Sequence, residues 1–181
     1  TIVRAVAAPT MSDFRFSKVV IFLCSHSSQG SMGIIVNKPA LEIKFTDLLK
    51  QLKVKFNNEI IFPSIYFGGP VENGRGFVLH SNDYLGDSST MIINKHLYLT
   101  ATLDILQDIA IGNGPEKCLL TLGCSGWGPG QLEQELTTDS WIITDYSEEI
   151  LFESKDDEKW EKAYGSLGVD PSKLSPFLGS A

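Results

Sequence analysis

Hydrophobic residues recur along this chain in two patterns, one typical of strands and one typical of helices. The runs 18–24 and 32–37 are apolar and rich in β-branched residues, which is the composition of buried strands. The Ser- and Gly-containing segment 25–30 joins them, so we expect the two runs to pair as an antiparallel hairpin. Further strands are expected at residues 1–9, 64–67, 76–80, 91–93, 96–99, 117–122 and 141–144.

Short connections between some of these strands predict two more hairpins. A Gly- and Pro-containing loop separates 64–67 from 76–80, and a turn at residues 94 and 95 separates 91–93 from 96–99. Pro39 is expected to end the strand that precedes it, because proline cannot donate a backbone hydrogen bond.

Four segments have helical spacing or helix boundary signals. Phe45, Leu48, Leu49 and Leu52 recur at i, i+3, i+4 and i+7, which predicts a short amphipathic helix. The other helices are expected after strands or loops in the second half of the chain. Their expected ranges are about 102–110, 130–136 and 156–167. The residues expected to begin the four helices are Thr46, Thr102, Pro129 and Asp156.

This order of elements predicts an α+β fold with a mixed sheet. Strands come as hairpins in the first half and alternate with helices in the second, which does not fit a doubly wound parallel sheet. The chain has 181 residues, 43% of them hydrophobic, and no linker-like segment divides it. We therefore expect one domain over residues 1–181.

Net charge limits the partners that this protein can have. The formal charge is −7, and residues 91–181 hold 15 acidic and 6 basic groups. Direct DNA binding is therefore not expected, since an acidic surface repels the phosphate backbone. The best basic stretch is Lys38 to Lys55, which also contains Glu42 and Asp47, and we expect it to be a solvated face.

Cysteine usage and hydropathy predict a cytoplasmic protein. The chain has three cysteines, an odd number that does not suit a disulfide framework. No apolar run approaches the roughly 18 residues that span a bilayer, and residues 1–9 are too short for a signal peptide.

Three blocks of sequence resemble the bacterial YqgE/AlgH family, which has no established activity. The likeness extends from about Ile2 to Leu174. The blocks are Val20–Cys24 with His26, Gly33 and Asn37–Pro39; Phe67–Val71 with Arg75–His80; and Leu122–Gly123 with Gly126–Glu133. The chain departs from the family at Ser25, where an acidic residue is common, and at Cys124–Ser125, where Tyr-Ala is usual.

The resemblance implies a fold, a location and a label, but no chemistry. The implied fold is a mixed, strongly bent sheet that forms a partly closed, barrel-like body with flanking helices. The implied location is the bacterial cytoplasm. Some members are labelled transcriptional regulators, without a recognisable DNA-binding module.

The glycine-rich segment 123–130 is the first candidate site. A loop between a strand and a helix start exposes backbone amides that can hold an anion. The segment does not match a Walker A motif, a GxGxxG motif or a nucleophile elbow. A sharp turn beneath a packed indole is the favoured alternative. The candidate ligand-binding residues here are Gly126, Trp127, Gly128 and Gln131.

A second candidate site follows the Gly68-Gly69-Pro70 turn. Gly69, Arg75 and His80 combine a turn, a cation and an imidazole, which could hold a carboxylate or phosphate. The favoured alternative is that Arg75 pairs with an acidic residue nearby.

Cys24 and His26 form a candidate reactive pair. They are two residues apart, so both lie on one face of a regular strand. A buried cysteine and a hydrogen-bonded histidine are the favoured alternative. His80, Cys118 and Cys124 could add ligands only if the fold brought them near, so we expect no metal and no cofactor.

These observations favour a non-catalytic binding or regulatory domain for a small anion or a protein partner. The alternative is a hydrolase or transferase that uses Cys24 or Ser125 with a histidine. Direct DNA binding ranks third, because no helix-turn-helix spacing is present.

Overall fold

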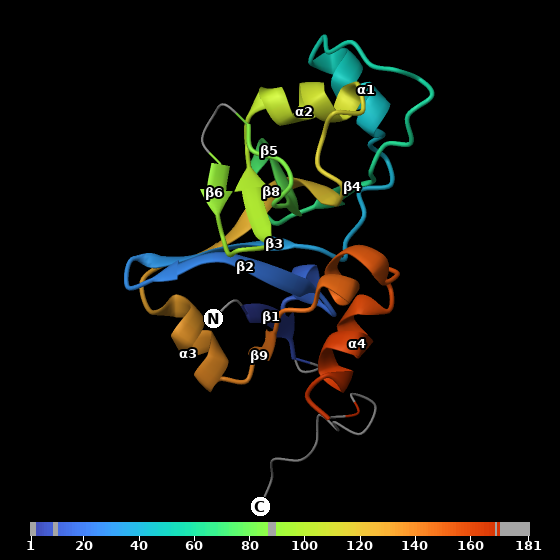
Figure 1. Cartoon of the computed structure of the whole chain (residues 1–181). Helices are drawn as coiled ribbons and strands as arrows, with labels where there is room; N and C mark the ends of the chain where they lie inside the picture. The colour runs from blue at the N-terminus through green and yellow to red at the C-terminus, as the bar shows by residue number, and fades with distance from the viewer. Residues whose placement is uncertain (1–2, 9–10, 87–89, 169, 171–181) are drawn as a thin grey trace, which may run out of the picture. The chain divides into compact units, whose positions relative to one another are not determined.

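The computed structural model describes residues 3–8, 11–86, 90–168 and 170, and it divides into two compact units (Figure 1). Unit 1 comprises residues 1–37 and 125–181, and unit 2 comprises residues 38–124. Strand β8 (Cys118–Trp127) belongs to both, since its first part pairs within unit 2 and residues 125–127 pair with β3 in unit 1.

Unit 1 is built on an antiparallel sheet. Its strands lie in the order β9, β1, β2, β3, followed by the end of β8. These strands are β1 (Val3–Ala7), β2 (Val20–Ser27), β3 (Gly30–Ile35) and β9 (Trp141–Asp145). The helices of unit 1 are the 3-10 helix η1 (Phe14–Phe16), α3 (Gln131–Thr137), the π-helix η2 (Glu149–Glu153) and α4 (Lys159–Gly165).

Alternation along the strands buries both faces of this sheet. Ala5, Ile21 and Ile35 belong to one core cluster, which also includes Leu132 of α3. The strand residues that point to the opposite face of the sheet, such as Phe22, are buried as well. Because neither face is polar, the strands read as continuous apolar runs and not as alternating ones.

Helix α4 is fixed to the sheet of unit 1 by side chains that donate to backbone carbonyls. Trp160 Nε1 donates to Ala7 O over 2.8 Å, and Tyr164 Oη donates to the same oxygen over 3.2 Å. The Lys159 ammonium, which is almost fully buried, donates to Val36 O over 2.8 Å. It also lies 2.9 Å from Asp156 Oδ1, which offsets part of the cost of burying the charge.

Unit 2 has a mixed sheet and two helices. Strand β8 lies between β5, which is antiparallel to it, and β4, which is parallel to it. The antiparallel order continues from β5 to β7 and β6. The elements are α1 (Phe45–Gln51), β4 (Ile65–Phe67), β5 (Val71–Ser81), β6 (Thr90–Ile92), β7 (Leu97–Thr100) and α2 (Leu103–Ala110).

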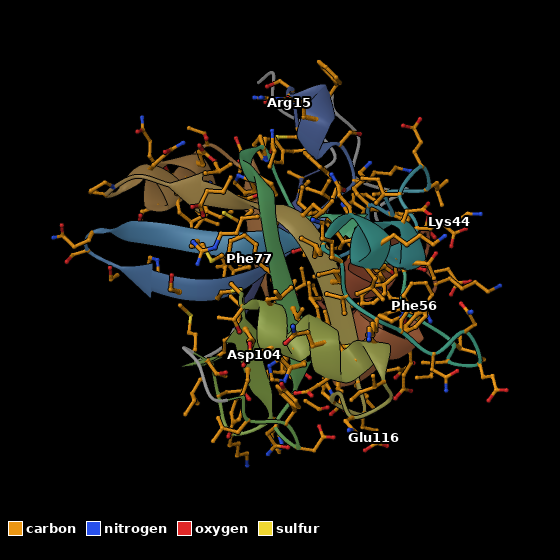
Figure 2. The ribbon with its side chains drawn as sticks, turned by 90° about the horizontal axis from the view of Figure 1, so that it is seen from above. Arg15, Lys44, Phe56, Phe77, Asp104 and Glu116 are labelled. Atoms are coloured by element: carbon orange, nitrogen blue, oxygen red, sulfur yellow. The ribbon has the colours of Figure 1, made fainter. Side chains whose placement is uncertain are left out.

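The core of unit 2 is apolar and lies between the sheet and both helices. Figure 1 shows α1 and α2 near one another at one end of this unit. Leu49 of α1 and Ile105 of α2 are fully buried and belong to the same cluster as Val78 of β5 and Leu120 of β8. Figure 2 labels Phe56, which packs against this cluster from the loop after α1.

The predicted α+β class and the mixed sheet are confirmed. All the expected strands and the four expected helices are present, although several limits differ. The single-domain prediction for residues 1–181 stays a prediction, and an unfolding test of it is given below.

Some of the expected connections are wrong. The strands at 64–67 and 76–80 do not form a hairpin, because β8 lies between β4 and β5. The connection between β2 and β3 is not the six residues expected, since Ser27 pairs with Gly30 and leaves a two-residue turn. Long-range pairing with β8 provides hydrogen bonds that local turn signals do not show.

Three of the expected helix starts are also wrong. Helix α1 follows Lys44, so Thr46 lies inside it, and α3 follows Gly130, so Pro129 lies outside. Helix α4 follows Glu158 and not Asp156, whose carboxylate pairs with Lys159 instead. Only Thr102 occupies the expected position, and its hydroxyl donates to Asp104 and not to the backbone.

Candidate functional site

The glycine-rich segment 123–128 is mainly strand and not the expected loop. Met32 pairs with Gly126 and Ser31 pairs with Trp127, so β8 continues to residue 127. Gly123 is necessary in this strand because its φ is +74° and a Cβ there would lie 2.4 Å from Gly69 O. The amides expected to hold an anion are therefore part of a strand, which weakens the case for an anion site.

Only a short turn remains between β8 and α3, and a side chain already occupies its first amide. Gly128 N donates to Gln131 Oε1 over 3.0 Å. Gln131 Nε2 in turn donates to Glu135 Oε1 over 2.8 Å. These two hydrogen bonds therefore connect groups at the start of α3 to one another.

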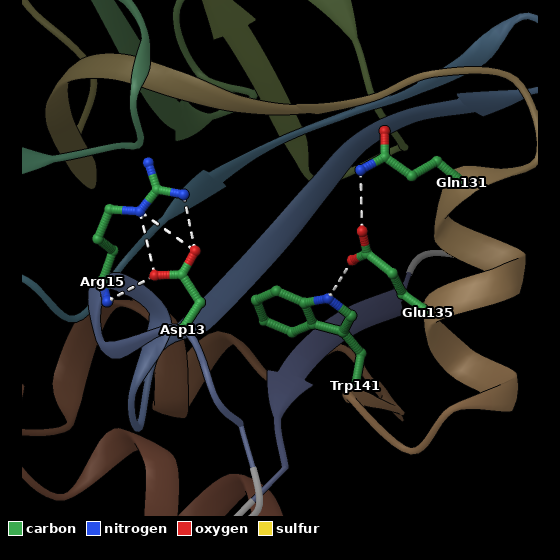
Figure 3. A network of polar contacts seen from close by, with 5 residues as sticks. All are labelled: Asp13, Arg15, Gln131, Glu135 and Trp141. Atoms are coloured by element: carbon green, nitrogen blue, oxygen red, sulfur yellow. Dashed lines mark hydrogen bonds and ion pairs between the residues drawn. The ribbon is translucent and has the colours of Figure 1, made fainter.

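Glu135 of α3 is the centre of a polar network in unit 1 (Figure 3). Its Oε2 accepts from Trp127 Nε1 over 3.0 Å and from Trp141 Nε1 over 2.7 Å. The two indoles meet edge to face, with ring centroids 5.8 Å apart. One carboxylate thus satisfies the N–H donors of two buried indoles, which is a structural role for Trp127 and for Glu135.

His26 lies on the same face of the sheet, between a hydroxyl and a carboxylate. Its Nδ1 is 2.7 Å from Ser31 Oγ, and its Nε2 is 3.4 Å from Glu133 Oε1. A tautomer that carries the proton on Nε2 would donate to Glu133 and accept from Ser31. This order of groups is the one that activates a hydroxyl nucleophile. Ser31 is only 7% exposed, however, so a substrate has little access to it.

A β-bulge at Cys24 interrupts the alternation of β2 side chains between the two faces of the sheet. Leu23 pairs with Gly33 and Ser25 pairs with Met32, so Cys24 is the extra residue. His26 therefore faces the same side as Leu23, and the regular alternation that would place Cys24 and His26 on one face is interrupted. Cys24 is buried, and its Sγ donates to Phe22 O over 3.7 Å.

Ser125, the other candidate nucleophile, is shielded, and the two cysteines considered as metal ligands have poorly reactive thiols. Ser125 is 3% exposed in β8. Burial raises the pKa of the Cys118 thiol to about 11, and burial also raises the pKa of the Cys124 thiol, with a further contribution from Glu72. At neutral pH these two thiols are protonated and weakly nucleophilic.

The second candidate site is in unit 2, and its charged groups interact with one another. Arg75 Nη1 lies 3.4 Å from Glu72 Oε1, and its guanidinium lies 5.2 Å from the centroid of the Phe77 ring. His80 is fully buried, with Nδ1 2.8 Å from Ser81 O and Nε2 2.8 Å from Thr100 Oγ1. Burial lowers the pKa of His80, so it stays neutral and is not available to an external anion.

The candidate residues thus fall into separate groups. In unit 1 the structure brings His26 together with Ser31 and Glu133, and Trp127 together with Gln131 through Glu135. In unit 2, Arg75 and His80 each have partners of their own. A ligand role for Gly69, Gly126 and Gly128 stays a prediction.

Sequence reasoning missed the hollows on the surface of unit 2. A groove of about 320 Å³ is lined by residues 39–41, 43–46 and 62–65. A second hollow of about 330 Å³ shares Phe62 and Pro63 with it, and an apolar hollow of about 190 Å³ lies between α1, α2 and the sheet. The only signal in the sequence was apolar residues without strand or helix spacing, such as Leu41 and Ile61.

Within the described ranges, no group of three or more His, Cys, Asp or Glu side chains could hold a metal ion. Over the same part of the chain, no helix has both the length and the hydropathy needed to cross a membrane.

The fold and the polar cluster on α3 define an α+β protein, and comparison with known proteins gives its family. Residues 4–172 match the model of the AlgH-like family. A UPF0301 protein of Ruegeria pomeroyi is 48% identical over 177 residues, which cover 97% of this chain and 96% of the relative. One of Methylocella silvestris is 46% identical over 183 residues, with 97% and 89% covered. The chain therefore belongs to the AlgH-like family, as its resemblance to the YqgE/AlgH family indicated.

Solved structures agree with this assignment. The AlgH protein from Pseudomonas aeruginosa is similar with a TM-score of 0.78 and 36% identity, covering 99% of this chain and 95% of that one. A protein from Corynebacterium diphtheriae shares the fold with a TM-score of 0.69 and 18% identity, covering 88% and 83%. None of these names states an activity, so function has to be argued from the surface.

Proposed function

We propose that this protein is a binding module that holds a protein partner through the surface of unit 2. The observation that supports this is the distribution of exposed apolar side chains. Among the described residues, unit 2 has eleven large hydrophobic side chains that are exposed and unit 1 has two, Phe14 and Leu167. Those of unit 2 are Leu41, Ile43, Leu52, Ile61, Phe67, Val71, Leu85, Met91, Ile92, Leu103 and Ile111.

Hollows in unit 2 strengthen this proposal over the small-anion alternative. Exposed apolar groups beside grooves are typical of protein-binding surfaces. Two of the groups predicted to hold an anion are already engaged, since Arg75 lies against Glu72 and the Gly128 amide donates to Gln131. A regulatory role would then act through contact with another protein and not through DNA. We place that role in the bacterial cytoplasm, in agreement with three free cysteines.

Site-specific photo-crosslinking tests the proposal. The photoreactive residue p-benzoylphenylalanine replaces Leu41 or Ile61 in the full chain, and Phe14 of unit 1 serves as the matched control because it is exposed to a similar degree. After irradiation of bacterial cells, we expect discrete protein adducts from positions 41 and 61 and none from position 14. Equal adducts from all three positions, or none from any, would contradict the proposal.

A catalytic role is the second candidate, and the contacts of His26 are the observation that favours it. In that role the nucleophile would be Ser31, with Glu133 orienting His26, in place of Cys24 or Ser125. A fluorophosphonate probe would then label Ser31 in the wild-type protein and not in His26→Asn. Labelling that is absent or equal in both proteins removes this candidate.

A further inference from the structure

The groove of about 320 Å³ in unit 2 is lined by apolar side chains together with Lys44, Thr46 and Ser64, and the fold holds it in place. Leu41 is 86% exposed and Ile43 is 40% exposed on one side of it. Phe45 and Phe62 stack within it, with centroids 5.1 Å apart and planes 17° from parallel. A groove with two aromatic rings already packed needs little ordering when a ligand binds.

Backbone hydrogen bonds fix the segment that carries Leu41. Ala40 N donates to Ile65 O over 2.8 Å, and Phe67 N donates to Lys38 O over 2.8 Å. Residues 38–40 therefore lie along the edge of β4, and the apolar side chains that follow are presented from a rigid base. Exposure of Leu41 is a consequence of this geometry and not of a loose chain end.

Lys44 lines this groove and belongs to a lysine-rich stretch of the chain without acidic partners. Residues 38–55 contain five lysines and two acidic residues, and Lys44, labelled in Figure 2, lines the groove itself. Among the described side chains, the ion pairs within 4.0 Å include none of the five. The lysines are Lys38, Lys44, Lys50, Lys53 and Lys55. An excess of uncompensated positive charge beside an apolar groove is complementary to acidic groups that flank apolar ones.

We infer that this groove binds a segment of a partner protein in which large apolar side chains are flanked by Asp or Glu. The inference rests on the proposed function and specifies the chemistry of the partner. The apolar side chains of that segment bury Leu41 and Ile43, and its carboxylates lie near Lys44, which lines the groove. Apolar burial supplies most of the affinity, and the charges select the partner and speed association.

A peptide segment fits this groove better than an anionic membrane does. The hollow is concave and its volume is that of a few side chains, whereas a bilayer presents a broad surface. The chain has a net charge of −7, which repels an anionic bilayer over distances comparable to the screening length of about 10 Å. A local peptide contact is less affected by distant acidic groups.

Selection from a random peptide library tests the inference. A phage library of random dodecapeptides is panned on the full chain, and enriched peptides are synthesised with a fluorescent label for polarisation measurements. We expect the enriched peptides to combine large apolar residues with an excess of Asp and Glu. Leu41→Ser and Lys44→Glu should each raise Kd by about tenfold, as loss of a contact worth about 1.4 kcal/mol does. The matched controls in unit 1, Phe14→Ser and Lys155→Glu, should leave Kd within about twofold.

The outcomes separate this inference from the proposed function. Enriched peptides without an acidic excess, weakened by Leu41→Ser but not by Lys44→Glu, overturn the inference while the crosslinking result can still hold. Peptides insensitive to both variants also overturn it. Co-sedimentation with phosphatidylglycerol vesicles that is lost in both variants would identify a lipid surface as the occupant and overturn it as well. Circular dichroism spectra of all variants confirm that they are folded.

Discussion

Units 1 and 2 bury their cores by different means, and the difference shows which of them is the better candidate for binding. Unit 1 carries 7 basic and 13 acidic residues, and among its described residues only two large hydrophobic side chains are exposed. Unit 2 carries 8 basic and 9 acidic residues and has eleven such side chains exposed. Unit 1 thus satisfies its own apolar surface, whereas unit 2 leaves part of its apolar surface for another molecule.

The helices illustrate the same difference. In unit 1, α4 is held by three directed hydrogen bonds, from Lys159, Trp160 and Tyr164 to backbone carbonyls. In unit 2, α1 and α2 are held mainly by packing in an apolar cluster. Hydrogen bonds between fixed donors and acceptors specify one position for a helix, whereas an apolar surface can accept partners of several shapes.

Core truncations should have the largest effects and also test whether the two units unfold together. Trp160→Ala in unit 1 should cost about 3–5 kcal/mol and Ile105→Ala in unit 2 about 2–5 kcal/mol, from lost burial and the cavity that remains. All three tryptophans, Trp127, Trp141 and Trp160, belong to unit 1, so fluorescence reports that unit alone.

If residues 1–181 form a single domain, both probes report the same transition. Ile105→Ala should then lower the urea midpoint measured by tryptophan fluorescence as much as the midpoint measured by circular dichroism. A fluorescence midpoint unchanged from wild type would show that the units unfold separately. The two units would then be separate domains.

Removal of the Glu135 carboxylate should have a smaller effect that is confined to unit 1. Glu135→Ala leaves the indole N–H groups of Trp127 and Trp141 without their acceptor, which should cost about 1–3 kcal/mol. Urea unfolding measures the loss. Glu135→Gln keeps one oxygen acceptor and should cost less than the Ala variant. Equal losses of unfolding free energy in the two variants would mean that packing, and not the hydrogen-bond acceptor, determines the loss.

Acidification should weaken unit 2 through His80. Burial lowers the pKa of His80 below its ordinary value of 6.5, so the unfolded chain binds this proton more readily than the folded one. The stabilisation is complete above about pH 6.5 and is lost as the pH falls below it. Unfolding free energies between pH 7.5 and about pH 5 should show this slope, and His80→Gln should reduce it. His96→Gln, at an exposed position, serves as the control and should leave the slope unchanged.

Two exposed side-chain contacts, one in each unit, should have the smallest effects. Glu133→Gln removes the contact with His26, and Arg75→Ala removes the contact with Glu72. Both pairs are about half exposed, so each change should shift the unfolding free energy by less than about 1 kcal/mol. A loss several times larger for Arg75→Ala would assign a structural role to its position over the Phe77 ring.

Local patterns in the sequence were sufficient to predict most elements and the hairpins β2–β3 and β6–β7, but not the pairing of strands that are distant in the chain. The apolar run 18–24 and the helical spacing at 45–52 correspond to β2 and α1, because burial determined both patterns. Strand β5 begins at Val71 and crosses a charged, glycine-containing segment, which has no strand pattern. Its pairing with β8 provides the hydrogen bonds that hold it there.

The candidate site was harder to predict for the same reason. A bulge at Cys24 depends on pairing with β3, and its effect on the direction of His26 cannot be read from spacing alone. His26 contacts Ser31 and Glu133, and neither residue follows it at a helical or strand spacing. Glu133 also lies on another element. Residue type identified His26 as a candidate, but only the fold shows what it contacts.

The insertion of unit 2 into unit 1 also has a consequence for biosynthesis. Strands β1, β2 and β3 leave the ribosome first, but β9, which pairs with β1 from Val3 to Ala7, is translated only after all of unit 2. Unit 2 is a continuous segment and can acquire its core while translation continues, whereas the edge of β1 stays open until β9 has been translated. A translational pause after residue 124 would therefore prolong the time during which that edge can pair with the wrong strand.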